Sequence, residues 1–302
     1  MTETLRVGTR RSLLARAQTD WVVRRLGRLH PEIRFKPVLI DASGDRVRSP
    51  GVSPDFTDAL DQALLQKDLD LAVHSAKDLP AELDSRLDLV ACPVRADPRD
   101  CLVVARPYRA SSLPKGARIG SSSLRRRAQL LRWRPDLHVV EIRGNVDTRI
   151  GLVRSGTIEG AILAVAGIAR LGRSAEIARR LPVTGFVPAP AQGALAVVTR
   201  AGHSSAADLV QRIDDRGTHA CVIAERAFAA AIGGDCNLPL GALATCRGDT
   251  VSLVGEVLRP DGRLSLRRRR HGPASEARTI GAHLGQAMLD GGARDLISSA
   301  SQ

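Results

Sequence analysis

The sequence predicts an α/β protein built from two similar units and completed by a smaller C-terminal α+β domain. Short apolar runs typical of buried strands alternate with stretches of helical periodicity as far as about residue 200. From about residue 214 the pattern changes to a long helix followed by a hairpin. A chain of 302 residues is long enough for two or three domains. The strand–helix–strand alternation favours a largely parallel sheet.

The first unit has the order β-α-β-α-β. Residues 4–8 have the composition of a strand, and residues 12–29 carry apolar side chains at the spacing of an amphipathic helix, which His30-Pro31 ends. Serine, glycine, proline and charged residues predict a loop over 43–55. The other elements expected in this unit are a helix over 59–66 and strands over 35–40, 69–74 and 87–92.

The second unit repeats this alternation. Its expected elements are strands over 101–105, 118–120, 139–142 and 161–166, and helices over 122–133, 148–155 and after residue 166. Three prolines indicate a crossing linker over 182–192, and 195–199 is again strand-like. The elements expected in the third domain are a helix over 220–231, a hairpin of 251–258 and 264–269 that turns at 260–262, and a last helix over 276–289.

Composition excludes several classes of protein. The hydrophobic content of 43% is that of a folded globular chain, and no run approaches the ~18 apolar residues of a membrane span. Residues 1–10 lack the basic start and apolar core of a secretory signal, so we expect a cytoplasmic location. The five cysteines are widely spaced and include no C-x-x-C pair, which disfavours a disulfide framework and a metal site.

The formal net charge is +13, and only 4 of the 45 basic residues are lysines. An anionic partner is one interpretation of this charge, and nucleic acid is the obvious candidate. The aromatic residues are two Trp, one Tyr and four Phe, too few for a base-stacking platform. We therefore expect no nucleic-acid partner and interpret the Arg267–Arg270 run as the exposed end of a strand.

Polar and cationic side chains follow the ends of several expected strands. Arg10 and Ser12 follow the first strand, and Lys77 and Asp78 follow the strand over 69–74. In an open α/β sheet the carboxyl ends of the strands line the ligand crevice. The members of this group in the second unit are Ser121, Ser123, Arg125, Arg126, Arg143 and Arg149. The sequence therefore predicts a cationic ligand site at the strand ends.

The expected helix start at Ser121–Arg127 is the clearest candidate for an anion-binding position. A serine suits the N-cap, but three arginines in the first turn add charge to a helix end that is already partly positive, at roughly 0.3–1 kcal/mol each when exposed. A bound anion would offset that cost. Arginines that point into solvent are the alternative. Several arginines and serines together suit a ligand with several carboxylates or phosphates.

Asp78 and Cys236 are the strongest candidates for residues that take part in chemistry. Asp78 is an acid among basic groups, where a carboxylate can stabilise a cation or move a proton, and an ion pair with Lys77 or a helix cap is the alternative. Cys236 lies in a glycine-rich loop, where a thiol can act as a nucleophile, although Asp235 beside it would raise the pKa of the thiol. His74 is expected to be packed rather than catalytic.

Ten short motifs follow one another along the chain. They are TR-x-S at 9–12, SGD at 43–45, AVHSAKDLP at 72–80, DPRD at 97–100, GSSSLRR at 120–126, RGNV-x-TR at 143–149, ILAVAG at 162–167, QGA at 192–194, AERA at 224–227 and C-x-x-P at 236–239. Together they resemble the porphobilinogen deaminase (hydroxymethylbilane synthase) family nearly from end to end. One such motif would carry little weight, but this many in the same order is specific.

The resemblance implies three domains: domain 1 over 1–94 and 194–212, domain 2 over 98–188, and domain 3 over 215–302. Domains 1 and 2 would be α/β domains like those of periplasmic binding proteins, with the active site in the cleft between them. Domain 3 would be an α+β domain with a cysteine loop. The implied enzyme is a transferase of haem and other tetrapyrrole biosynthesis. It joins four porphobilinogen molecules with loss of ammonia and releases hydroxymethylbilane by hydrolysis.

The resemblance also implies residue roles. Cys236 would hold a covalent dipyrromethane cofactor through a thioether. Asp78 would be the catalytic carboxylate, which contacts pyrrole nitrogens and stabilises positive charge as ammonia leaves. The residues that would bind cofactor and substrate are Arg10, Ser12, Lys77, Ser121, Ser123, Arg125, Arg126, Arg143, Arg149, Arg170 and Gln192.

Three functions remain open from the sequence. The transferase uses both Asp78 and Cys236, whereas a divergent, weakly active or non-catalytic polycarboxylate-binding relative would need neither, so the presence of both favours the transferase. A nucleic-acid binder is the third and is disfavoured by the shortage of aromatic residues. The chain departs from the family pattern at Ser53–Phe56, where the usual lid lysine is missing, and at Asp235. The enzyme is expected to be a monomer.

Overall fold

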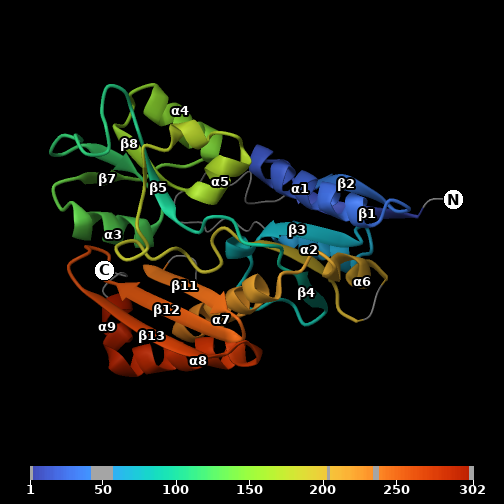
Figure 1. The fold of residues 1–302 in the computed structure, drawn as a ribbon. Helices are drawn as coiled ribbons and strands as arrows, with labels where there is room; N and C mark the ends of the chain where they lie inside the picture. Colours follow the sequence, from blue (N-terminus) through green and yellow to red (C-terminus); the bar gives the residue numbers. More distant parts are fainter. Residues whose placement is uncertain (1–2, 42–56, 203–204, 234–237, 299–302) are drawn as a thin grey trace.

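Three β-sheets organise the computed structural model, which describes residues 3–41, 57–202, 205–233 and 238–298. Figure 1 shows the first two sheets, coloured from blue to yellow-green, above the C-terminal sheet in orange and red. The fold class expected from the sequence, two α/β units and a small α+β domain, is confirmed. The residue boundaries of the three domains stay a prediction.

The first sheet has the strand order β2-β1-β3-β10-β4. Its strands are β1 (Thr4–Arg10), β2 (Arg34–Ile40), β3 (Leu71–Ser75), β4 (Leu87–Ala91) and β10 (Leu195–Arg200). β1 is parallel to β2 and to β3, whereas β10 is antiparallel to both β3 and β4. The chain therefore returns from the second unit to complete the first sheet.

Helices cover both faces of the first sheet. They are α1 (Leu13–Leu29), α2 (Asp58–Leu65) and α6 (Ser205–Gln211). α1 and α6 share one core with the sheet through Leu26 and Val210, and α2 packs in the other core through Leu60 and Leu64. Ser12 begins α1 as predicted, because its Oγ accepts a hydrogen bond from the Ala15 N–H at 3.2 Å.

The second sheet has the order β7-β6-β8-β5-β9. Its strands are β5 (Asp100–Val104), β6 (Arg118–Gly120), β7 (His138–Val140), β8 (Gly160–Ala164) and β9 (Arg179–Arg180). The helices around it are α3 (Leu124–Trp133), α4 (Val146–Arg154) and α5 (Val165–Arg170). α4 and α5 share one core with the sheet and α3 the other. β6 is parallel to both neighbours, so its carboxyl end and those of β7 and β8 lie at one edge of the sheet.

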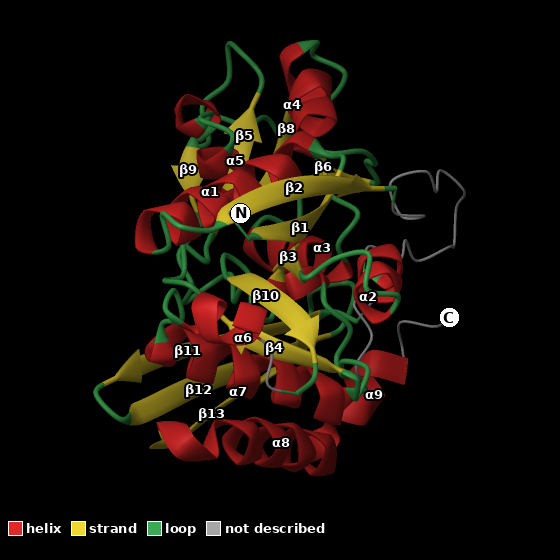
Figure 2. Cartoon of the chain, turned by 90° about the vertical axis from the view of Figure 1, so that its right-hand side faces the viewer, coloured by secondary structure: helices red, strands yellow, loops and turns green. Residues whose placement is uncertain are grey.

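The third sheet is antiparallel, in the order β11-β12-β13. Its elements are α7 (Arg216–Ile232), β11 (Leu240–Arg247), β12 (Thr250–Leu258), β13 (Ser265–Pro273), α8 (Ala277–Met288) and α9 (Arg294–Ser298). The predicted hairpin and both long helices are confirmed. β11 was not predicted, because its Gly and Ala residues lack the branched alternation of a strand. Figure 2 shows α8 on the outer side of this sheet.

Two segments cross between the first two sheets, 92–99 from β4 to β5 and 181–194 from β9 to β10. We call them the crossing segments. The Ala96 N–H donates to the Gly193 carbonyl at 3.1 Å, and Gln192 Nε2 donates to the Pro98 carbonyl at 2.8 Å. Gly193 has φ +88°, and a Cβ there would lie 2.7 Å from the Ala96 oxygen. Glycine is therefore required for this close crossing.

Glu225 of α7 joins the third domain to both crossing segments. Its carboxylate is fully buried and accepts from Arg95 Nη1 at 2.6 Å and Nη2 at 3.0 Å. It also accepts from the backbone N–H groups of Ala191 at 2.5 Å and Ala244 at 2.6 Å. One carboxylate thus holds both crossing segments and β11. None of the helices in the described parts of the chain is long and apolar enough to cross a membrane.

Candidate active site

The site residues of the first sheet lie at the carboxyl ends of two adjacent parallel strands. Arg10 is the last residue of β1, and Ser12 caps the helix that follows. Lys77 and Asp78 form the short 3-10 turn η2 (Ala76–Asp78) directly after β3. Both side chains are half-buried. No ion pair joins Asp78 to Lys77 in the described residues, so that alternative for Asp78 is not seen.

His74, at the end of β3, is packed as predicted. It is 4% exposed, and burial lowers the pKa of its imidazole to about 4, with further lowering from the charges of Arg10 and Arg226. The Nε2 atom lies 3.8 Å from Asp61 Oδ1. The histidine is therefore neutral at ordinary pH and places Arg10 beside an uncharged neighbour rather than a second cation.

The predicted site residues of the second sheet lie at the starts of α3 and α4 and at the end of α5. Ser121 follows β6, and its Oγ accepts from the Ser123 N–H at 3.2 Å. Ser123 in turn caps α3, accepting from the Arg126 N–H at 3.4 Å. Arg149 lies in the first turns of α4 and Arg170 is the last residue of α5. Ser121 and Ser123 therefore follow β6, at the end of the strand where the sequence predicts them.

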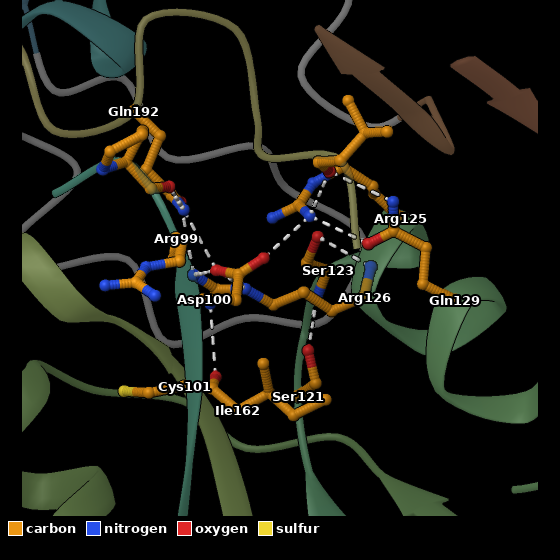
Figure 3. A network of polar contacts seen from close by, with 12 residues as sticks. Arg99, Asp100, Cys101, Ser121, Ser123, Arg125, Arg126, Gln129, Ile162 and Gln192 are labelled. Atoms are coloured by element: carbon orange, nitrogen blue, oxygen red, sulfur yellow. Dashed lines mark hydrogen bonds and ion pairs between the residues drawn. The ribbon is translucent and has the colours of Figure 1, made fainter. Parts of the chain in front are cut away.

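Arg125 and Arg126 meet a carboxylate of the protein itself. Arg125 Nη1 donates to Asp100 Oδ2 at 2.7 Å, and Arg126 donates to Asp100 Oδ1 through Nε at 3.0 Å and Nη2 at 2.7 Å. Figure 3 shows Asp100 between the two guanidiniums. The side chains of Arg125 and Arg126 are 3% and 8% exposed, so they do not point into solvent. The charge that offsets the crowded helix start is Asp100, which the sequence analysis left without a role.

Gln192 completes this group. It is 1% exposed, and its Nε2 donates to Asp100 Oδ1 at 3.0 Å, while its Oε1 accepts from Arg126 Nη2 at 3.3 Å. Burial alone would raise the pKa of Asp100, but the charges of Arg125 and Arg126 outweigh it and hold that pKa well below its usual value. Asp100 is therefore ionised throughout the physiological range.

Arg149 and Arg170 have no such carboxylate. Arg149 Nε donates to the Gly144 carbonyl at 2.8 Å, and Arg170 Nη2 donates to the Gly193 carbonyl at 2.8 Å. Burial lowers the pKa of each to about 10, with the charge of Arg126 adding to the effect on Arg149. Neither forms an ion pair with a described residue. They are half-buried cations held in place by uncharged oxygen atoms.

The ammonium of Lys77, on the turn after β3 of the first sheet, interacts electrostatically with charged residues of the second sheet. Burial lowers the pKa of its ammonium, the charge of Asp78 raises it, and the charge of Arg126 lowers it again. The turn η2 of the first sheet therefore lies within electrostatic range of the helix start of α3. A second approach of the two units is at α1, because a Cβ on Gly167 of α5 would lie 3.5 Å from Leu14 Cδ2.

Two predicted residues lie apart from this group or outside the structure. Arg143 is exposed and pairs with Glu141 at 2.8 Å. Cys236 lies outside the described residues, between Gly233, which ends α7, and Leu238. A small cavity of about 220 Å³ lies between Trp133 and Phe186, and no predicted site residue lines it.

Sequence reasoning missed Asp100 and Glu225. Both belong to motifs that were noted, DPRD at 97–100 and AERA at 224–227, but neither received a role. The signal that could have found Asp100 is the excess charge of the Arg125–Arg127 helix start, which demands a counter-ion. For Glu225, an acid on the apolar stripe of a long helix predicts a buried partner.

The fold and site together define an α/β protein in which Arg149 and Arg170 are half-buried and form no ion pair with a described residue. A family model described as "Porphobilinogen deaminase, dipyromethane cofactor binding domain" matches residues 5–208, and one described as "Porphobilinogen deaminase, C-terminal domain" matches residues 219–290. The chain belongs to the porphobilinogen deaminase family, and its first two units are the part that matches the family's cofactor binding domain.

Named relatives agree over nearly the whole chain. The porphobilinogen deaminase of Thermus thermophilus is 42% identical over 293 residues, which cover 97% of each chain. That of Roseiflexus castenholzii is 41% identical over 303 residues, covering 99% of this chain and all of the relative. Among solved structures, the methionine binding protein MetQ has a TM-score of 0.47 and 11% identity, covering 70% of this chain and 89% of that one.

Proposed function

We propose that this chain is a porphobilinogen deaminase, or hydroxymethylbilane synthase. It joins four porphobilinogen molecules with loss of ammonia and releases the linear product by hydrolysis. Family membership supports the reaction. In the structure, the supporting observation is the pair of half-buried guanidiniums, Arg149 and Arg170, that have no carboxylate partner among the described residues. Porphobilinogen carries an acetate and a propionate, so each added unit brings two carboxylates that such cations bind.

The residues at the site fit a dipyrromethane cofactor. Arg149 and Arg170 are half-buried and held by hydrogen bonds, and Lys77 lies within electrostatic range of Arg126, so the carboxylates of two linked pyrroles would find several cations already in place. Cys236 would hold the group through a thioether. When bound, the cofactor supplies the pyrrole carbon to which the first substrate is joined. A covalent primer also spares the enzyme the entropy of rebinding an intermediate in each round.

Asp78 is the proposed catalytic carboxylate. It lies on the turn after β3, half-buried and without an ion-pair partner among the described residues. Beside the pyrrole N–H of porphobilinogen, its negative charge would stabilise the positive charge that develops as the carbon–nitrogen bond breaks and ammonia leaves. The electron-poor methylene carbon then forms a carbon–carbon bond with the free end of the chain, which loses a proton that a carboxylate can receive.

The surrounding residues would bind and orient. Arg10, Ser12, Ser121, Ser123 and Arg143 lie at strand ends and are proposed to contact carboxylates of the growing chain. Arg125, Arg126 and Gln192 are proposed to form the floor of the site around Asp100. The residues assigned to the site belong to one chain, and we propose that the enzyme is a monomer that acts on a small molecule without a nucleic-acid partner.

Intact-protein mass spectrometry tests the proposal. The wild-type chain should carry a covalent addition equal to two linked pyrroles and should turn over porphobilinogen. Cys236→Ala should lose the addition and the activity, whereas Asp78→Asn should fold normally and lose turnover. An unchanged addition on Cys236→Ala would move the attachment elsewhere. A wild-type chain with neither addition nor turnover would contradict the proposed function.

A further inference from the structure

Asp100 contacts three residues that the sequence assigns to ligand binding. Its Oδ1 accepts hydrogen bonds from Arg126 and Gln192, and its Oδ2 accepts from Arg125 (Figure 3). Two of these contacts come from the start of α3, and the third comes from the second crossing segment. Asp100 itself is the first residue of β5, directly after the first crossing segment. It therefore joins three parts of the chain that lie far apart in the sequence.

Asp100 cannot contact a ligand. It is fully buried, and both of its oxygens are taken by protein donors. Any effect on the reaction must pass through the groups that it holds. Arg126 illustrates this, because its Nε and Nη2 reach Asp100 while its Nη1 donates to the Ile162 carbonyl at 3.2 Å. The orientation of this guanidinium is fixed by the protein before any substrate arrives.

The pairing of Asp100 with Arg125 and Arg126 also decides which cations of the site keep no carboxylate partner. Adjacent buried guanidiniums without a counter-ion would repel each other, and burial already lowers the pKa of Arg125, against which Asp100 acts. Asp100 cancels one of the two charges, so Arg125, Arg126 and Asp100 together keep a single positive charge. The other cations near this group are Arg149, Arg170 and Lys77, which have no such carboxylate among the described residues.

We propose that Asp100 is a positioning residue of the enzyme: it fixes the side chains of Arg125, Arg126 and Gln192 and cancels one of the two guanidinium charges, so that substrate carboxylates meet an ordered group of cations. The inference rests on the proposed function. It assigns Asp100 a part in substrate binding rather than in chemistry. Loss of Asp100 should therefore raise KM for porphobilinogen more than it lowers kcat.

Two variants of Asp100 test the positioning role, and they differ in how strongly they are expected to destabilise the fold. Asp100→Asn keeps the shape of the side chain and removes its charge, leaving two buried guanidiniums uncompensated. Asp100→Glu keeps the charge and displaces it by one methylene group. The matched control is Asp97→Asn, three residues earlier on the same segment. Asp97 pairs with Arg99 at 2.7 Å, and the Arg99 side chain is 42% exposed, so its loss should leave KM unchanged.

Steady-state kinetics with porphobilinogen should order KM as wild type, then Asp100→Glu, then Asp100→Asn. The last should rise about tenfold or more, with kcat within about threefold. A purely structural role would reduce the folded fraction, and hence apparent kcat, without moving KM. If Asp100→Asn does not fold, a raised KM in folded Asp100→Glu supports the proposal alone.

Two results overturn it. Wild-type KM in the folded variants, while the wild-type enzyme is active, would reject the positioning role and leave the proposed function intact. An equal rise of KM in Asp97→Asn would show that the segment, not Asp100, is responsible. A wild-type chain that does not turn over porphobilinogen would instead reject the proposed function, and this inference with it.

Discussion

At the scale of single residues, the site is organised by which cations have an acidic partner. Arg125 and Arg126 share Asp100, whereas the hydrogen-bond partners of Arg149 and Arg170 among the described residues are uncharged: backbone carbonyls and, for Arg149, the Ser122 hydroxyl at 3.4 Å. A carbonyl orients a guanidinium without cancelling its charge. Burial then makes that charge costly until an anion arrives, which favours binding of a carboxylate over water.

Arg170→Leu tests this distinction. The substitution keeps much of the apolar bulk and removes one half-buried charge, so we expect KM for porphobilinogen to rise about 10- to 150-fold, which corresponds to the loss of one charge-assisted contact of about 1.5–3 kcal/mol. The matched control is Arg269→Leu on β13, whose arginine is exposed. Steady-state kinetics should separate the two variants. Equal effects would mean that general positive charge, not the half-buried guanidinium, attracts the substrate.

At the scale of elements, glycines set how closely the helices of the third domain approach. α7 and α8 cross at Gly281 and Gly285, where a Cβ on Gly281 would lie 2.1 Å from the Ala224 oxygen and 2.9 Å from Ala227 Cβ. Gly255 of β12 likewise leaves room for the ring of Phe228, which a Cβ would approach to 2.5 Å. The core of this small domain therefore depends on backbone contact rather than on large side chains.

Gly281→Ala should destabilise the protein even though alanine is the better helix former. The backbone carbonyl of Ala224 cannot move aside without opening the α7–α8 contact, so we expect a loss of roughly 1–3 kcal/mol. Gly27→Ala in α1 is the control, since a Cβ there meets nothing within 4 Å. It should raise stability by about 0.4–1 kcal/mol. Thermal unfolding followed by circular dichroism distinguishes them, and a higher melting temperature for Gly281→Ala would contradict the packing argument.

At the scale of the whole molecule, buried acids connect the parts. Glu225 ties α7 to both crossing segments through Arg95 and Ala191. On the other face of the third sheet, the fully buried Glu256 accepts from Arg132 at 2.8 Å and from Arg267 through Nη2 at 3.0 Å, which joins β12 and β13 to α3. The expectation that Arg267 belongs to an exposed strand end is therefore only partly right, because its side chain bridges two domains.

Glu225→Gln should lower the free energy of unfolding of the whole protein. It leaves the guanidinium of Arg95, which is 11% exposed, without a counter-ion, and breaking a buried pair in this way costs about 3–5 kcal/mol. Glu159→Gln removes a similar bidentate partner from Arg118, which is 49% exposed, and should cost no more than about 1 kcal/mol. The comparison is the fall in melting temperature. Equal falls would show that Glu225 is not a joint between domains.

Much of this protein could be predicted from its sequence. Periodicity predicted most of the helices and strands, because the alternation of apolar and polar residues is a local property that burial of one face imposes. Ser12 and Ser123 were recognisable as helix starts for the same local reason. The position of Lys77 and Asp78 after a strand followed from the order of elements, and the ordered motifs predicted the family.

The tertiary structure alone decided the partners of the charged residues. Nothing local distinguishes Arg125, which pairs with an acid 25 positions away, from Arg170, which reaches only a carbonyl of the crossing segment. The place of β10 beside β3, and of Glu225 beside Arg95, likewise depends on how the chain returns between the sheets. A charge acts on whatever lies within a few ångströms, and in a folded chain those neighbours are brought together by the packing of distant segments.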